Sequence, residues 1–98
     1  MNFLKLITEL EEVSTQIGVK IRYEKGDFDG GYCILKEEKI LVVNKRLTDA
    51  RKASILAQAL TEIGIESIFI KPALRDFIDN EAAKYRKTKN LIKKVASL

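Results

Sequence analysis

Hydrophobic residues recur at steps of three and four along the first seventeen residues of the chain. These positions are Phe3, Leu6, Ile7, Leu10, Val13 and Ile17. Such spacing places one apolar stripe along a helix, so we expect an amphipathic helix over residues 2–17. Asn2 can accept the free amide hydrogens at its start, and Gly18 can adopt the left-handed conformation that ends it.

Apolar and charged side chains then alternate one by one. They are Val19, Lys20, Ile21, Arg22, Tyr23 and Glu24. A period of two predicts a strand with one buried face. Two apolar runs follow, Tyr32–Leu35 and Ile40–Val43, and the charged segment between them predicts a hairpin. Because Ile40–Val43 is apolar on both faces, we expect it to be central in a three-stranded antiparallel sheet.

Two further helices complete the predicted fold. Thr48 can cap a helix over residues 48–63, and Asp49 favours the positive end of its dipole. Apolar residues cover more than one stripe of this helix, which predicts burial against both the sheet and another helix. Pro72 suits the first turn of a third helix, which runs past Tyr85. The expected class is α+β in the order α-β-β-β-α-α, with the sheet packed on the core helix and the other helices flanking it.

Length and charge place one domain on the chain. Its 98 residues, 46% hydrophobic and 33% charged, suit one globular core. We expect a single domain over residues 1–85, with residues 86–98 as a basic helical extension of it. Residues 1–80 hold 12 Lys and Arg against 13 Asp and Glu, whereas residues 81–98 hold six against one. The net charge of +4 is therefore the sum of −1 and +5, and the basic character lies in the C-terminal segment.

The chain has the features of a cytoplasmic protein of bacterial type. Its single cysteine, Cys33, cannot form an intramolecular disulfide, so folding does not require an oxidising compartment. Acidic residues interrupt any signal-peptide pattern near the N-terminus, and no run of about 18 apolar residues occurs. We therefore expect no membrane contact.

Residue types exclude the common catalytic centres. The chain has no histidine and one cysteine, so one subunit cannot build the usual zinc ligand sets or a histidine-based triad. It also lacks a glycine-rich phosphate loop. We expect no enzyme activity and no cofactor. Asp27 and Asp29, in a glycine-rich loop, can converge on calcium or magnesium, although Asp and Gly are also the residues that tight turns require. Cys33, inside a predicted strand, is expected to be a core thiol rather than a nucleophile.

The C-terminal segment offers two alternative surfaces. An apolar edge predicts contact with a second copy or with another protein through Tyr85, Leu91, Ile92 and Val95. Its cations predict contact with nucleic-acid phosphates through Lys84, Arg86, Lys87, Lys89, Lys93 and Lys94. Because no aromatic residue beyond Tyr85 is interleaved with these cations, we favour a non-catalytic structural or protein-interaction module, and nucleic-acid binding is the alternative.

The order of helix, hairpin and core helix resembles the catalytic half of small zincin-type metallopeptidases that cleave phage repressors. In that family a strand precedes a helix bearing Leu-Ala-His-Glu-Leu-Gly-His. Ile40–Asn44 resembles the strand, and Leu56–Glu62 has the same apolar frame. Gln58 and Glu62 stand in the places of the two metal-binding histidines, and Ala59 in that of the general-base glutamate. The resemblance covers about half of the chain and implies a scaffold without zinc or peptidase activity.

Overall fold

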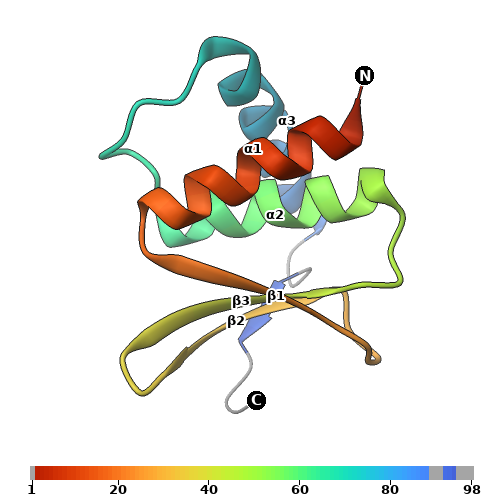
Figure 1. Ribbon diagram of the computed structural model, residues 1–98. Coiled ribbons are helices and arrows are strands. Elements are labelled where there is room, and N and C mark those ends of the chain that lie inside the picture. Colours follow the sequence, from red (N-terminus) through yellow and green to blue (C-terminus); the bar gives the residue numbers. More distant parts are fainter. Residues whose placement is uncertain (1, 89–91, 95–98) are drawn as a thin grey trace.

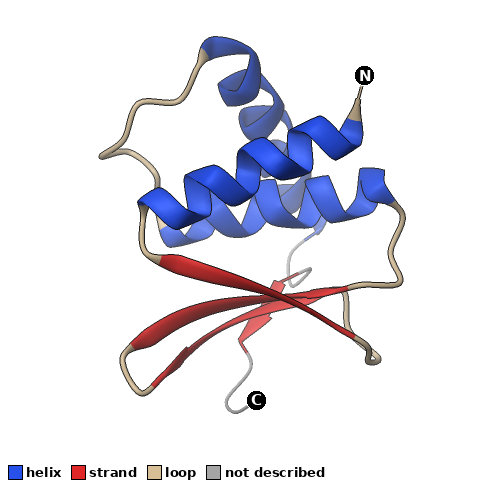
Figure 2. Ribbon diagram, in the orientation of Figure 1, coloured by secondary structure: helices blue, strands red, loops and turns tan. Residues whose placement is uncertain are grey.

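The helices of the described residues lie on one face of a small mixed sheet (Figures 1 and 2). The computed structural model describes residues 2–88 and 92–94, with the side chains of residues 2–84. The elements in chain order are α1 (Phe3–Gln16), β1 (Val19–Glu24), β2 (Gly30–Leu35), β3 (Glu38–Asn44), α2 (Asp49–Ile63), α3 (Pro72–Thr88) and β4 (Ile92–Lys94). The α+β class and the order of the first six elements agree with the prediction.

Both ends of α1 are set by the residues that the sequence indicated. The side chain of Asn2 accepts a hydrogen bond from the amide of Lys5 at 3.1 Å. Gly18 has φ +75°, so it occupies the left-handed region that a side chain disfavours. Helix α1 therefore turns directly into β1, and its buried residues Ile7, Leu10 and Val13 face the core.

The prediction of an antiparallel sheet is wrong. The strand order is β1-β3-β2-β4, with β1 parallel to β3 and β2 antiparallel to β3. The reason lies in the connection 25–29, which crosses the end of β3 instead of folding β2 back along β1. Asn44 holds this crossing in place, because its Nδ2 donates to the carbonyl oxygens of Gly26 at 3.0 Å and Phe28 at 2.8 Å.

Strand β3 is central, as its sequence predicted. Leu41 and Val43 face the helices within the main core, while Ile40 and Val42 pack with Cys33 on the opposite face of the sheet. All four residues of Ile40–Val43 are buried. Burying both faces of one strand is the arrangement that an uninterrupted apolar run favours.

Helix α2 is the core helix. Thr48 caps it by accepting a hydrogen bond from the amide of Arg51 at 3.2 Å, and Gly64 ends it with φ +109°. Most of its residues from Ala53 to Leu60 are buried. The helix packs on the sheet and against both α1 and α3, which confirms the prediction from its broad apolar surface.

The C-terminal extension is not helical throughout. Helix α3 ends at Thr88, and Ile92–Lys94 forms the short strand β4, parallel to β2. The prediction that residues 86–98 are helical is therefore wrong for Ile92–Lys94, which form a strand. Among residues 72–84, whose side chains are described, the apolar stripe of α3 has its last buried apolar residue at Ala82, whereas β2 offers an edge that a following segment can join. Among the described helices, none is long and apolar enough to cross a membrane.

Candidate functional site

Strand β1 forms one edge of the sheet. Alternate residues of a strand direct their backbone N–H and C=O groups to opposite neighbours. The carbonyl oxygen of Glu24 accepts a hydrogen bond at 3.0 Å from the amide of Lys45, the residue that follows β3. The backbone N–H and C=O groups of Glu24, and of Arg22 and Lys20 before it, are therefore directed towards β3. The backbone groups of Val19, Ile21 and Tyr23 consequently face the open edge.

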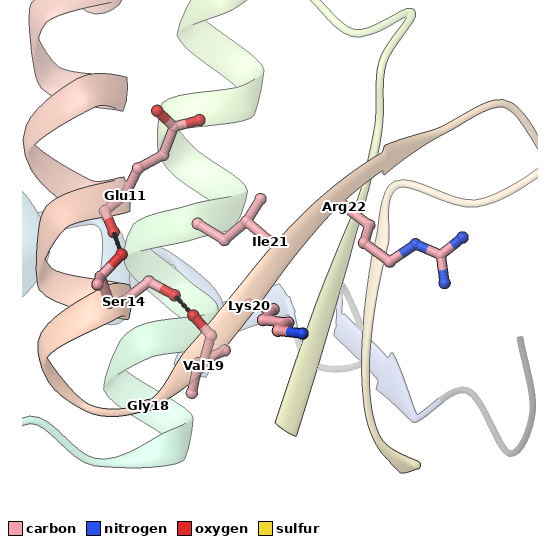
Figure 3. Close-up of a pocket in the computed structure, with 8 residues that line it drawn as sticks. Glu11, Ser14, Gly18, Val19, Lys20, Ile21 and Arg22 are labelled. Carbon is pink, nitrogen blue, oxygen red and sulfur yellow. Dashed lines mark hydrogen bonds between the residues drawn. The ribbon is translucent and has the colours of Figure 1, made fainter. Parts of the chain in front are cut away.

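A groove of about 540 Å³ runs beside this edge, between α1 and β1. Its lining residues are Glu11, Ser14, Thr15, Gly18, Val19, Lys20, Ile21 and Arg22. Figure 3 shows Ile21 on the α1 side of β1, while Lys20 and Arg22 point away from the helix. On the side of α1, the groove therefore presents mainly apolar and hydroxyl groups. On the outer side it presents the cations of Lys20 and Arg22.

One end of the open edge is closed by Ser14. This buried side chain donates a hydrogen bond to the carbonyl oxygen of Val19 at 2.6 Å (Figure 3). The bond satisfies an acceptor that would otherwise face outwards. The N–H and C=O groups of Ile21 and Tyr23 therefore make up the open part of the edge.

Tyr23, near the end of β1, also joins this strand to α1. Its hydroxyl donates a hydrogen bond to Oε2 of Glu11 at 2.5 Å, and Nζ of Lys52 lies 5.8 Å from its ring centroid. Burial raises the pKa of the Tyr23 hydroxyl, and the hydrogen bond and negative charge of Glu11 raise it further. Tyr23 therefore stays protonated and acts as a donor at neutral pH.

A second groove, of about 1050 Å³, lies between α2 and α3. At its base Ser54 donates a hydrogen bond to Oε1 of Glu81 at 2.5 Å, and Nζ of Lys84 donates to Oε2 of the same carboxylate at 2.9 Å. Glu81 is only 6% exposed, so these two donors stabilise a buried carboxylate.

The orientation of Gln58 follows from the hydroxyl of Ser54. A hydroxyl has one hydrogen, and Ser54 gives it to Glu81, so Gln58 must present its nitrogen to Ser54. Nε2 of Gln58 lies 2.9 Å from Oγ of Ser54, and Oε1 of Gln58 is buried without a hydrogen-bond partner among the described residues. The groove thus contains one unsatisfied buried acceptor.

The acidic loop residues Asp27 and Asp29 belong to no cluster of three or more metal-ligating side chains among the described residues. Asp29 pairs with the guanidinium of Arg51 at 3.0 Å, an interaction that places its charge against α2. Within residues 2–88 and 92–94, no three His, Cys, Asp or Glu residues gather as metal ligands, Asp27 and Asp29 included. Cys33 is 7% exposed in β2, in agreement with the prediction of a core thiol.

The predicted C-terminal surface is described only in part. Lys84 lies in α3 with Glu81 as an ion-pair partner. The structure describes only the backbone of six further predicted residues. Helix α3 contains Tyr85, Arg86 and Lys87, and β4 consists of Ile92, Lys93 and Lys94. Leu91, Val95 and Lys89 lie outside the described residues. Neither surface predicted for this segment is tested.

The residues compared with the zincin motif lie on α2. Gln58 and Ala59 are buried, and Glu62 is exposed near the end of the helix. Comparison of the chain with protein-family models, with curated proteins and with solved structures finds no match.

Two elements of these grooves were absent from the sequence prediction. The open edge was not singled out, although the expected central place of Ile40–Val43 implies that the first strand is an edge. Lys20 and Arg22 are also the kind of charged residue that exposed edge strands carry. Glu81 was missed because only its charge was counted, within the segment 81–98. Its position three residues after Ile78, within the apolar stripe of α3, was a usable signal of burial.

Proposed function

We propose that this chain is a non-catalytic protein-interaction module that binds an extended segment of another protein along the open edge of β1. One observation carries the proposal: the outward backbone groups of Ile21 and Tyr23 lie beside a groove of about 540 Å³. An added strand gains affinity from main-chain hydrogen bonds and specificity from pockets for alternate side chains. Both requirements are met at this edge.

The engagement of the polar side chains supports a role without catalysis. The hydroxyl of Ser54 donates to Glu81, Cys33 is buried, and Tyr23 donates to Glu11. A nucleophile needs an adjacent base together with access to substrate. The proposal also accommodates the resemblance to zincins, as a scaffold that keeps the fold without the metal-binding residues.

The charge distribution favours nucleic-acid binding as a second candidate. Residues 81–98 carry a net charge of +5, which suffices to neutralise several phosphates. This surface lies at the C-terminal end of the chain and is independent of the edge of β1. The two candidates can therefore be separated by experiment.

Amide hydrogen exchange on the ¹⁵N-labelled chain tests the proposal. The probes are three capped nine-residue peptides in which valine alternates with glutamate, threonine or lysine. At least one should slow exchange at the amides of Ile21 and Tyr23, because these N–H groups face the open edge. The amides of Lys20 and Arg22 face β3, so they serve as internal controls whose exchange changes less.

Methylation of the peptide backbone supplies a matched control. In an added strand, only alternate residues direct their N–H groups towards β1. N-methylation of one alternate set should abolish binding, while N-methylation of the other set should leave it unchanged. Equal effects of the two sets, or no protection by any peptide, would refute strand addition.

A further inference from the structure

The two faces of the open edge differ in charge. Lys20 and Arg22 lie on the outer face of β1, away from the helices, whereas Ile21 lies on the helical face (Figure 3). In a paired strand, the side chain directly opposite a given residue lies on the same face of the sheet. Positions of an added strand that lie beside Lys20 and Arg22 will therefore meet two cations.

Both cations can exchange their present partners. Nζ of Lys20 lies 3.1 Å from Glu38, and the guanidinium of Arg22 lies 3.2 Å from Glu24. Both side chains are highly exposed, at 68% and 48%. Ion pairs of this kind contribute little to stability, so a carboxylate on an added strand can compete for the cations.

The helical face favours a different kind of side chain. Ile21 supplies an apolar surface there, and Thr15 supplies a hydroxyl. The carboxylate of Glu11 on this side already accepts the hydroxyl of Tyr23. Small apolar or β-branched residues fit these positions, so the groove suits a strand whose acidic and apolar residues alternate.

A second copy of the chain is a poor match for the same edge. Two copies could pair their β1 strands antiparallel with Ile21 opposite Ile21, a register that would use most of the open edge. This register centred on Ile21 sets Lys20 of each copy opposite Arg22 of the other. The register centred on Arg22 sets the two arginines opposite each other, but it also sets Lys20 of each copy opposite Glu24 of the other. The charge argument against pairing of two copies therefore rests mainly on the register centred on Ile21. Like charges directly opposite on paired strands destabilise the pairing, and such charges protect natural edges from self-association.

We infer that the segment bound at β1 comes from another protein and carries Asp or Glu at alternate positions opposite Lys20 and Arg22, with apolar residues between them. This inference rests on the proposed strand addition and specifies its partner. It concerns charge, whereas strand addition itself depends on the backbone groups of Ile21 and Tyr23.

Charge reversal tests the inference on the full chain. The dissociation constants of the valine–glutamate, valine–threonine and valine–lysine peptides are measured by amide chemical-shift titration at low and high ionic strength. The wild-type chain should bind the glutamate peptide about tenfold more tightly than the lysine peptide at low salt, with a smaller ratio at high salt. The double variant Lys20→Glu/Arg22→Glu should reverse this order.

A control variant separates the edge from the overall charge. Lys5→Glu/Lys36→Glu makes the same change in net charge at two exposed positions outside β1. It should keep the wild-type preference. A preference that reverses equally in the control would show that net charge, and not the edge, selects the peptide.

The remaining outcomes are distinguishable. If all three peptides protect Ile21 and Tyr23 with equal affinity, the acidic partner is wrong while strand addition stands. If none of them binds, strand addition fails as well. If the amides of Ile21 and Tyr23 become protected as the concentration of the chain alone rises, a second copy occupies the edge and the inference is overturned.

Discussion

The hydroxyl of Tyr23 donates a hydrogen bond to Oε2 of Glu11 at 2.5 Å and thereby joins β1 to α1. The bond from Ser14 to the carbonyl oxygen of Val19 lies at the start of the same strand. Each joins the same helix to the same strand. The distance between helix and strand is therefore fixed at both ends of the segment that is open to an added strand.

Tyr23→Phe should destabilise the chain and change its response to alkali. Losing a half-buried hydrogen bond to a carboxylate should lower the free energy of unfolding by about 1–2 kcal/mol at neutral pH. The Tyr23 hydroxyl has an ordinary pKa of 10.0, which the folded state raises. Its stabilising contribution is complete below pH 10. Above that pH the unfolded chain loses the proton first, so the contribution falls, by at most about 1.4 kcal/mol per pH unit.

Urea denaturation of the wild type and Tyr23→Phe from neutral pH to about pH 11.5 measures this effect. The difference between the two chains should shrink above pH 10. Glu11→Gln keeps an acceptor for the hydroxyl but removes the charge, so its cost should be smaller than that of Tyr23→Phe. A difference that stays constant across pH 10 would contradict a raised pKa for Tyr23.

Ser54→Ala should be among the more costly polar-to-alanine substitutions. It removes a hydroxyl donor from the buried carboxylate of Glu81 and leaves Lys84 as the other donor in the network. The expected loss is about 2 kcal/mol, since hydrogen bonds to charged groups are stronger than neutral ones. Chemical denaturation gives the value, and Ser67→Ala, at an exposed position, is the control. If both variants lose the same free energy of unfolding, the hydrogen bond from Ser54 to Glu81 does not contribute to stability.

Gln58→Met should stabilise the chain. Methionine has a similar volume and removes the buried Oε1, which lacks a partner among the described residues, together with the hydrogen bond from Nε2 to Ser54. The bond from Ser54 to Glu81 remains. We expect the free energy of unfolding to rise by about 1 kcal/mol, because an unsatisfied buried acceptor costs about 1–3 kcal/mol. Thermal unfolding checks the direction. A clear loss of stability would mean that Oε1 has a partner in solution.

Association through the C-terminal segment should be independent of β1. Strand β4 lies at the opposite edge of the sheet, so a homodimer formed there leaves the edge of β1 open. We expect light scattering to show a dimer for the full chain and a monomer for Leu91→Asp/Ile92→Asp. Peptide binding should be unchanged by this variant. If the double variant remains dimeric, the C-terminal contact is wrong.

Nucleic-acid binding would depend on the cations of the C-terminal segment and not on its apolar residues. Replacing Lys84, Arg86, Lys87 and Lys89 with glutamine should leave peptide binding at β1 unchanged and should abolish any retardation of DNA in a gel at low salt. If the wild-type chain retards DNA with a steep salt dependence and binds none of the peptides, the second candidate displaces the first.

Local patterns in the sequence were enough to locate the helices and the first three strands. Asn2, Gly18 and Thr48 act through contacts with their immediate neighbours, so their roles can be read from short windows. The central place of Ile40–Val43 was also predictable, because burial of both faces requires an uninterrupted apolar run.

Strand pairing was not predictable in the same way. A strand with one buried face has the same alternation whether its neighbour is parallel or antiparallel, so β1 carries no sign of its direction relative to β3. What decides it is the crossing of residues 25–29, which depends on hydrogen bonds from Asn44, 16 and 18 residues away from their acceptors. The groove between α2 and α3 was missed for the same reason, since it joins segments distant in sequence. The groove beside β1 is lined by residues of the single stretch 11–22.

The insertion of β3 between β1 and β2 has a consequence for the order of folding. During synthesis β1 is complete at Glu24, but its partner begins only at Glu38. The β2–β3 hairpin has a two-residue turn and closes locally, whereas β1 must wait and then dock on the far side of β3. Contacts between distant segments form more slowly than local ones. We therefore expect β1 to join the sheet after β2 and β3 have paired, and β1 then contributes the edge that stays open in the finished protein.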